Sequence, residues 1–201
     1  MQIEVEGVKE MRRAIRLFAP DLSKALDKEL RRVLTPIVRK AKGFVPTQSP
    51  MSGWSARSFS EAKFPPFVAS TIKSGIGLST KPGRTNSKGF TSNARIFNNS
   101  VAGAIYETAG RVPPGTGQRW GGPKAPGTGK GVSRSSNPGA GAQFISQLPE
   151  LTSSLKGRGR LIFKAWSEDN GKAYGAAFSA INATEKEFMA RTKTHRMSRA
   201  A

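Results

Sequence analysis

Residues 20–42 read PDLSKALDKELRRVLTPIVRKAK, and this stretch predicts the longest and clearest element of the chain. Its apolar side chains recur every three or four residues, the spacing that lines one face of an α-helix. They are Leu22, Leu26, Leu30, Val33, Leu34, Ile37, Val38 and Ala41. Pro20 and Asp21 suit the first turn of a helix, and the stretch would span about 35 Å at about 1.5 Å per residue. Pro36 removes a backbone donor, so we expect a kink near residues 32–36.

The end of this helix and its polar side are also visible in the sequence. Residues 41–46 read AKGFVP, where Gly43 permits a left-handed cap and Pro46 cannot continue a helix. The cations of the polar side are Arg31, Arg32, Arg39, Lys40 and Lys42. Two interpretations stay open for them: a solvated helix face, or a cationic surface turned toward nucleic acid or an acidic neighbour.

Four further segments predict strands, at residues 2–7, 71–79, 89–97 and 100–108. Asn98 and Asn99 would form a tight turn between the last two, because asparagine tolerates positive φ. Helical spacing also predicts helices at 8–18 and 172–191, whereas 161–166 fits either a strand or a short helix. The fold class expected is α+β, with a small, mostly antiparallel sheet packed by the long N-terminal helix and a C-terminal helix.

We expect a single domain over residues 1–201 that carries two irregular parts. Residues 110–142 hold ten glycines, five prolines and no acid, which predicts a long loop or arm. Such a loop either orders on contact with neighbouring subunits or is disordered, and the sequence leaves both open. Residues 192–201 are predicted to be a basic flexible tail.

Composition restricts the partners and the compartment. The chain has 201 residues, a formal net charge of +20 and no cysteine. So large a positive charge indicates an anionic partner, with duplex nucleic acid the first candidate. The N-terminus resembles no secretory signal, and no apolar run is long enough to span a membrane. We therefore expect synthesis in the cytosol and no membrane partner.

The sequence does not predict an enzyme. Its one histidine, His195, has no nearby carboxylate to orient it and no second histidine with which to share a metal. The 13 acidic residues are scattered. Gly127-Thr128-Gly129-Lys130-Gly131 departs from a phosphate-binding loop at two required positions. We expect no catalytic residue, no metal, no cofactor and no small-molecule substrate.

Glu107 is the most unusual single residue, because it is the only acid between Ala62 and Pro149, where eleven lysines and arginines occur. It is either an exposed surface glutamate or one half of a salt bridge between subunits. The residues predicted for a subunit interface are Tyr106, Glu107, Arg111 and Trp120. Those predicted to lie near DNA are Arg39, Lys40, Lys42, Arg191, Lys193, Arg196 and Arg199.

Several short motifs, in order, carry a resemblance to a known family. They are AKGFVP at 41–46, SGWSARS at 52–58, a segment ending AIYETAGR at 104–111, and GRLI at 159–162 followed by a C-terminal helix. In this order they resemble the tail-completion or neck proteins of long-tailed bacteriophages. The resemblance covers most of the chain apart from the Gly/Pro loop, which is longer than the simple form of the family suggests. It favours a helix for residues 161–166.

The resemblance implies a structural virion protein made in the host cytoplasm. Its copies would form an oligomeric ring, with sixfold symmetry as a family-level expectation, between the capsid connector and the tail tube. Partners would be other neck, connector and tail-tube proteins and the duplex DNA that passes through the channel without sequence-specific contacts. The alternative is a sequence-independent basic nucleic-acid-binding protein, and a cell-wall or nucleic-acid-cleaving enzyme is a third, weaker interpretation.

Overall fold

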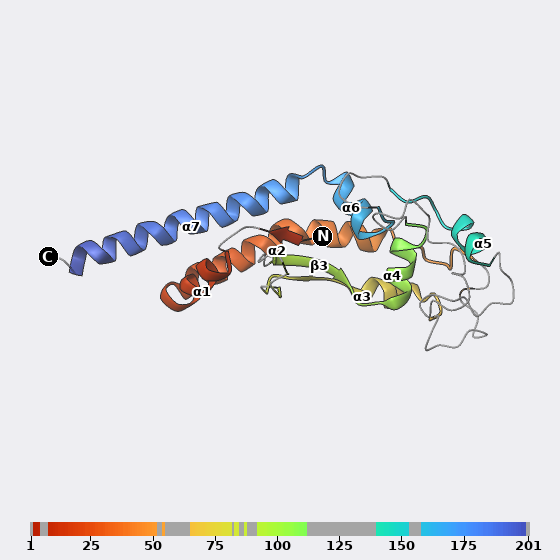
Figure 1. Ribbon diagram of the computed structural model, residues 1–201, viewed down its shortest axis with the longest axis horizontal. Helices are drawn as coiled ribbons and strands as arrows, with labels where there is room; N and C mark the ends of the chain where they lie inside the picture. The colour runs from red at the N-terminus through yellow and green to blue at the C-terminus, as the bar shows by residue number, and fades with distance from the viewer. Residues whose placement is uncertain are drawn as a thin grey trace. The chain divides into compact units, whose positions relative to one another are not determined.

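The computed structural model describes residues 2–4, 8–51, 54, 65–81, 83–84, 87, 92–111, 140–152 and 158–199. Figure 1 shows its elements in chain order. They are β1 (Gln2–Glu4), α1 (Val8–Phe18), α2 (Pro20–Gly43), α3 (Ala69–Gly75), β2 (Ile76–Ser79), β3 (Ser92–Asn98), α4 (Val101–Thr108), α5 (Ala140–Ser146), α6 (Ile162–Glu168) and α7 (Lys172–Arg199). The fold is α+β, as the sequence predicted.

The chain divides into two compact units. Unit 1 comprises Met1–Lys40, Gly77–Phe97 and Glu168–Ala201, and unit 2 comprises Ala41–Ile76 and Asn98–Ser167. The expectation of one domain over 1–201 stays a prediction.

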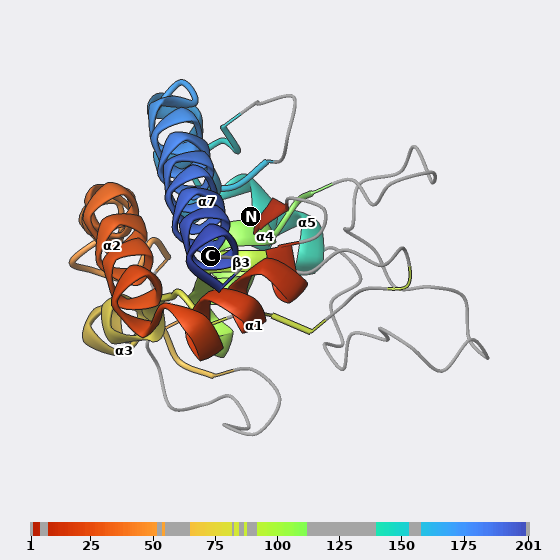
Figure 2. The ribbon, with the colours of Figure 1, turned by 90° about the vertical axis from the view of Figure 1, so that its left-hand side faces the viewer.

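Unit 1 is built on α1, α2 and α7. Ion pairs join Asp21 to Arg191 and Lys40 to Glu168, so α2 and α7 run antiparallel, side by side as in Figure 2. Most of the apolar positions of α2 that the sequence singled out are buried, among them Leu26, Leu30 and Leu34, whereas Val33 and Val38 are half-buried. Ile15, Ala19 and Leu22 form a core cluster against which Met11 and Phe188 pack.

The sheet has three strands in the order β1-β3-β2. Strands β1 and β3 are antiparallel, with Gln2 opposite Arg95 and Glu4 opposite Ser92. Ala94 and Ile96 of β3 are buried and Arg95 between them is exposed, but Ser92 and Asn93 are buried as well, so both faces of β3 are covered at its start.

Unit 2 has an aromatic core around Trp54. The ring centroid of Trp54 lies 5.2 Å from that of Phe67 and 5.0 Å from that of Phe144, both edge to face. Tyr106 of α4 joins this core, 5.9 Å from Phe67. Contacts of this kind add to the burial of apolar area, so these rings fix how α4 and α5 pack in unit 2.

Two strand predictions are wrong. Residues 101–108 form the helix α4, because Ser100 caps it by accepting a hydrogen bond from the Gly103 backbone N–H at 3.1 Å. Asn98 also accepts from the Ser100 backbone N–H at 2.9 Å, so the expected hairpin turn is instead the lead into a helix. Of residues 71–79, only Ile76–Ser79 is a strand, since α3 occupies Ala69–Gly75.

The helix ends also differ from expectation in two places, at the end of α2 and at the end of α7. Gly43 ends α2 without a left-handed φ, because the N–H groups of Phe44 and Val45 bond to carbonyls three residues back in a tight last turn. The chain breaks before α7 at Asn170 and Gly171, which both have positive φ. Helix α7 then continues to Arg199, beyond its predicted end at Arg191 and into the predicted tail.

Three more outcomes concern the predicted kink, residues 161–166 and the predicted loop. Helix α2 is continuous through Pro36. Residues 161–166 belong mainly to the helix α6, which settles the open choice in favour of helix. Of the predicted loop 110–142, residues 112–139 lie outside the described part of the chain, and its last residues belong to α5.

Candidate functional site

Glu107 is buried in unit 2 and bound by backbone amides. Its side chain comes from α4, and the residue is only 5% exposed. Its carboxylate accepts hydrogen bonds from the backbone N–H groups of Arg160 at 3.2 Å, Phe163 at 2.9 Å, and Leu161. These amides begin α6 and have no partner inside that helix. Glu107 therefore stabilises the start of a helix more than fifty residues away in sequence.

Arg160 completes the same arrangement in the opposite direction. Its guanidinium donates to the carbonyl oxygens of Tyr106 and Ala109, both at 2.9 Å, and to that of Pro149. Tyr106 and Ala109 lie at the end of α4, where carbonyl groups lack helical partners and favour a cation. The carboxylate from α4 thus caps α6, and the arginine just before α6 caps α4.

Gly159 explains why the two segments fit so closely. A Cβ atom at this position would lie 2.3 Å from Oε1 of Glu107 and 2.9 Å from a ring carbon of Phe163. Real Cβ contacts do not come as near as the first of these distances, so the site requires glycine. We call Glu107, Gly159 and Arg160 the interlock.

The electrostatics of the interlock are set by burial. Burial raises the pKa of the Glu107 carboxyl above its ordinary value of 4.5, although the backbone N–H groups oppose the shift. Burial also raises the pKa of Tyr106 and lowers that of Arg160. Among the described residues, no three His, Cys, Asp or Glu side chains gather as a metal site would require. The chemistry that the interlock offers is structural.

The predicted interface residues are therefore placed differently from expectation. Tyr106, Glu107 and Arg111 do come together, but inside unit 2: the Arg111 guanidinium lies 4.5 Å from the Phe163 ring centroid and donates to the Arg158 carbonyl. The interpretation of Glu107 as an exposed surface glutamate is wrong. Its buried oxygens also argue against a salt bridge to another subunit. Trp120 lies outside the described residues.

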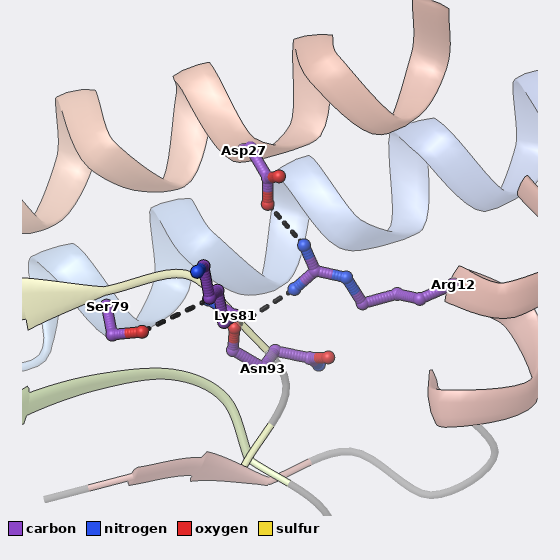
Figure 3. A network of polar contacts seen from close by, with 5 residues as sticks. All are labelled: Arg12, Asp27, Ser79, Lys81 and Asn93. Atoms are coloured by element: carbon purple, nitrogen blue, oxygen red, sulfur yellow. Dashed lines mark hydrogen bonds and ion pairs between the residues drawn. The ribbon is translucent and has the colours of Figure 1, made fainter. Parts of the chain in front are cut away.

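A second buried charge organises unit 1. Arg12 of α1 is 4% exposed and donates to the backbone carbonyl of Asn93 in β3 at 3.0 Å and to the carboxylate of Asp27 in α2. Figure 3 shows this guanidinium reaching both partners, with Ser79 accepting a hydrogen bond from the Lys81 backbone nearby. Arg12 thus ties two helices and the sheet together.

The residues predicted to lie near DNA do not form one patch. Lys40 pairs with Glu168 at 2.7 Å, and Arg191 pairs with Asp21 at 2.7 Å and Glu187 at 2.5 Å. These pairs stand at opposite ends of α2. Arg39 and Lys193 are exposed and Lys42 is half-buried, whereas the side chains of Arg196 and Arg199 lie outside the described part.

Three exposed cations of α2, Lys24, Lys28 and Arg31, stand outside the set predicted to lie near DNA, although Arg31 was already named among the cations of the polar side. Their spacing of four and three residues puts them on one line with Arg39. That signal is present in the sequence, since it is the same helical periodicity that identified the apolar face. It was overlooked because the basic residues were counted by their density along the chain.

The structure and the comparisons add two negative findings. In the part of the chain that is described, none of the helices combines the length and apolar character needed to cross a bilayer. Comparison with protein-family models, with curated proteins and with solved structures finds no match for this chain.

Proposed function

We propose that this chain is a structural protein of the head-to-tail junction of a long-tailed bacteriophage, a tail-completion or neck protein. Its copies would assemble into an oligomeric ring that joins the connector to the tail tube and surrounds the DNA channel. In this proposal it is a virion component without enzymatic activity, and its partners are neighbouring junction proteins and duplex DNA.

The observation that carries the proposal is the interlock. Two of the motifs on which the family resemblance rests, AIYETAGR at 104–111 and GRLI at 159–162, supply its residues. The Glu107 carboxylate occupies the space where a side chain at residue 159 would begin, so its position requires glycine there. The two motifs are short and far apart in sequence, but both are needed to build the interlock. This shared structural role supports the family resemblance.

Exposed apolar side chains support an assembling protein. Leu17 and Phe18, adjacent at the end of α1, are 68% and 77% exposed, and Met189 of α7 is 62% exposed. Neighbouring large apolar groups left in water mark surfaces that other proteins cover. In a chain of charge +20, such groups are an additional reason to expect protein partners as well as an anionic one.

A second candidate is a free, sequence-independent nucleic-acid-binding protein. The exposed cations of α2 favour it, because they suit phosphate contacts equally well outside a virion. It accounts less well for the exposed apolar residues of α1 and α7.

The mass of the purified protein in solution distinguishes these candidates. Light scattering behind a sizing column would be recorded at moderate salt, with and without duplex DNA. A discrete ring, formed alone or only with junction proteins, is the expected result. Monomers that load onto duplex without forming a closed oligomer would overturn the junction proposal and favour the free binder.

A further inference from the structure

Helix α2 carries a straight row of exposed cations, Lys24, Lys28, Arg31 and Arg39. At about 100° per residue, these four positions fall within about 80° of one another around the helix axis. The row extends about 22 Å along the helix at about 1.5 Å per residue. It lies on the side opposite the buried Leu26, Leu30 and Leu34, so the side chains point away from the core of unit 1. We call it the α2 row.

The ion pairs of unit 1 leave this row out. The pairs described there are Arg12–Asp27, Arg32–Glu29, Lys40–Glu168, Arg191–Asp21 and Arg191–Glu187. Asp21 and Asp27 are the acids of α2 nearest the row, and their carboxylates are held by Arg191 and Arg12. The three carboxylates of α2 itself, Asp21, Asp27 and Glu29, are therefore paired with other cations, and among the described residues no ion pair neutralises the α2 row.

The chemistry of the row fits a phosphate backbone. The core of a protein–protein interface is rich in apolar anchors and depleted of lysine. The α2 row has no apolar anchor, because the residue between Arg31 and Arg39 on the same line is Thr35. The row holds no aromatic ring on which an unpaired base would stack. Its length of about 22 Å matches roughly six base pairs of duplex at about 3.4 Å per pair.

We propose that the α2 row contacts the phosphate backbone of duplex nucleic acid without reading its sequence. This inference deepens the proposed function, because it names the surface that would face the DNA. It replaces the DNA-facing set expected from sequence with Arg39 and three residues outside that set.

The test is the salt dependence of duplex binding by the full chain. Fluorescence anisotropy of a labelled 24-base-pair duplex, a length of about four rows, would be measured over a range of salt concentrations. The variant Lys28→Gln with Arg31→Gln removes two charges from the row. Its matched control, Lys172→Gln with Lys186→Gln, removes two exposed charges from α7. A third variant, Lys28→Arg with Arg31→Lys, rearranges the row and keeps its charge.

Losing two phosphate contacts lowers the magnitude of the slope of log K against log salt by about 1.8. It weakens binding about sixty-fold at about 0.1 M salt. We expect this for the row variant, a much smaller change for the α7 control, and near wild-type binding for the charge-conserving variant. Equal effects of the row and control variants, an unchanged slope, or no duplex binding by the wild type would each overturn the inference.

Two readouts keep this inference separate from the proposed function. Thermal unfolding of each variant checks that the fold is intact, as the exposure of all four substituted positions predicts. Light scattering on the same variants follows assembly. A wild type that assembles while the row variant binds duplex normally would refute the row and leave the junction proposal standing. A wild type that never assembles would refute the junction proposal, and the duplex comparison would still decide the row.

Discussion

Glu107 and Arg160 are joined through the backbone and not as an ion pair. The carboxylate of Glu107 accepts from the Arg160 backbone N–H at 3.2 Å, while the Arg160 guanidinium donates to the carbonyl oxygens of Tyr106 and Ala109 at 2.9 Å. Each charged side chain satisfies the free backbone groups at the end of the other residue's helix. Because those groups would otherwise be buried without partners, the interlock contributes to stability on both sides.

The close fit at Gly159 predicts a loss of stability in Gly159→Ala. The added methyl group collides with Glu107, so the free energy of unfolding should fall by about 1 to 3 kcal/mol. Gly175→Ala is the matched control, because a Cβ at Gly175 of α7 meets no atom within 4 Å. Alanine suits a helix better than glycine, so the control should gain up to about 1 kcal/mol. Urea unfolding of both variants measures this, and equal shifts would contradict the fit.

Glu107→Gln should lower stability and change how stability depends on pH. The amide places an NH₂ group against backbone N–H donors, at a cost of about 1 to 3 kcal/mol. In the wild type, the pKa of Glu107 is raised in the folded state, so the folded state holds this proton more tightly than the unfolded state does. The stability that this bound proton contributes is fully present below pH 4.5 and is lost as the pH rises through the pKa of Glu107 in the folded state.

The glutamine variant lacks this titration. The stability difference between wild type and variant should therefore be largest below pH 4.5 and shrink as the pH rises. Thermal unfolding across this range measures the difference, and parallel curves would show that Glu107 does not titrate as proposed. Because Tyr106 and Glu107 are both buried, truncating them together should impair folding more than assembly, contrary to what their predicted place at a subunit interface implied.

Arg12→Ala should destabilise unit 1 strongly. The substitution removes the buried guanidinium, so the Asn93 carbonyl and the Asp27 carboxylate each lose a hydrogen-bond donor. We expect the free energy of unfolding to fall by about 2 kcal/mol or more. This is at the low end of the cost of breaking a buried ion pair, because the Asp27 side chain is 40% exposed. Arg32→Ala is the control, since its pair with Glu29 is exposed and screened by solvent. Similar midpoints for both variants in urea would refute the role of Arg12.

Leu17→Ser with Phe18→Ser should weaken assembly and leave the fold intact. Both side chains are exposed, so the free energy of unfolding should change by no more than about 0.5 kcal/mol. Light scattering should show a shift toward smaller species, because the substitutions remove apolar surface that a neighbour would cover. Ile15→Ala, at a buried position of the same helix, should instead cost about 2 to 4 kcal/mol. Unaltered assembly in the double variant would exclude the end of α1 from the interface.

Local periodicity accounts for the parts of the fold that sequence reasoning predicted well. The apolar spacing of residues 20–42 predicted α2 within one residue. Residues 101–108 were misread because alanine and glycine carry little periodic signal. The Ser100 cap is a local hydrogen bond, but it was outweighed by the apparent turn at Asn98 and Asn99.

By itself the sequence determined the α+β class, the long amphipathic α2 and the large excess of positive charge, because these follow from composition and from spacings within one helix. It also drew attention to Glu107 as an isolated acid. Only the tertiary structure decided what Glu107 does, since its partners Arg160, Leu161 and Phe163 are more than fifty residues away. Likewise, the pairing of Asp21 with Arg191 and of Asp27 with Arg12, which leaves the α2 row charged, depends on α7 and α1 packing against α2. Such partnerships are set by packing between distant segments, and no local pattern encodes them.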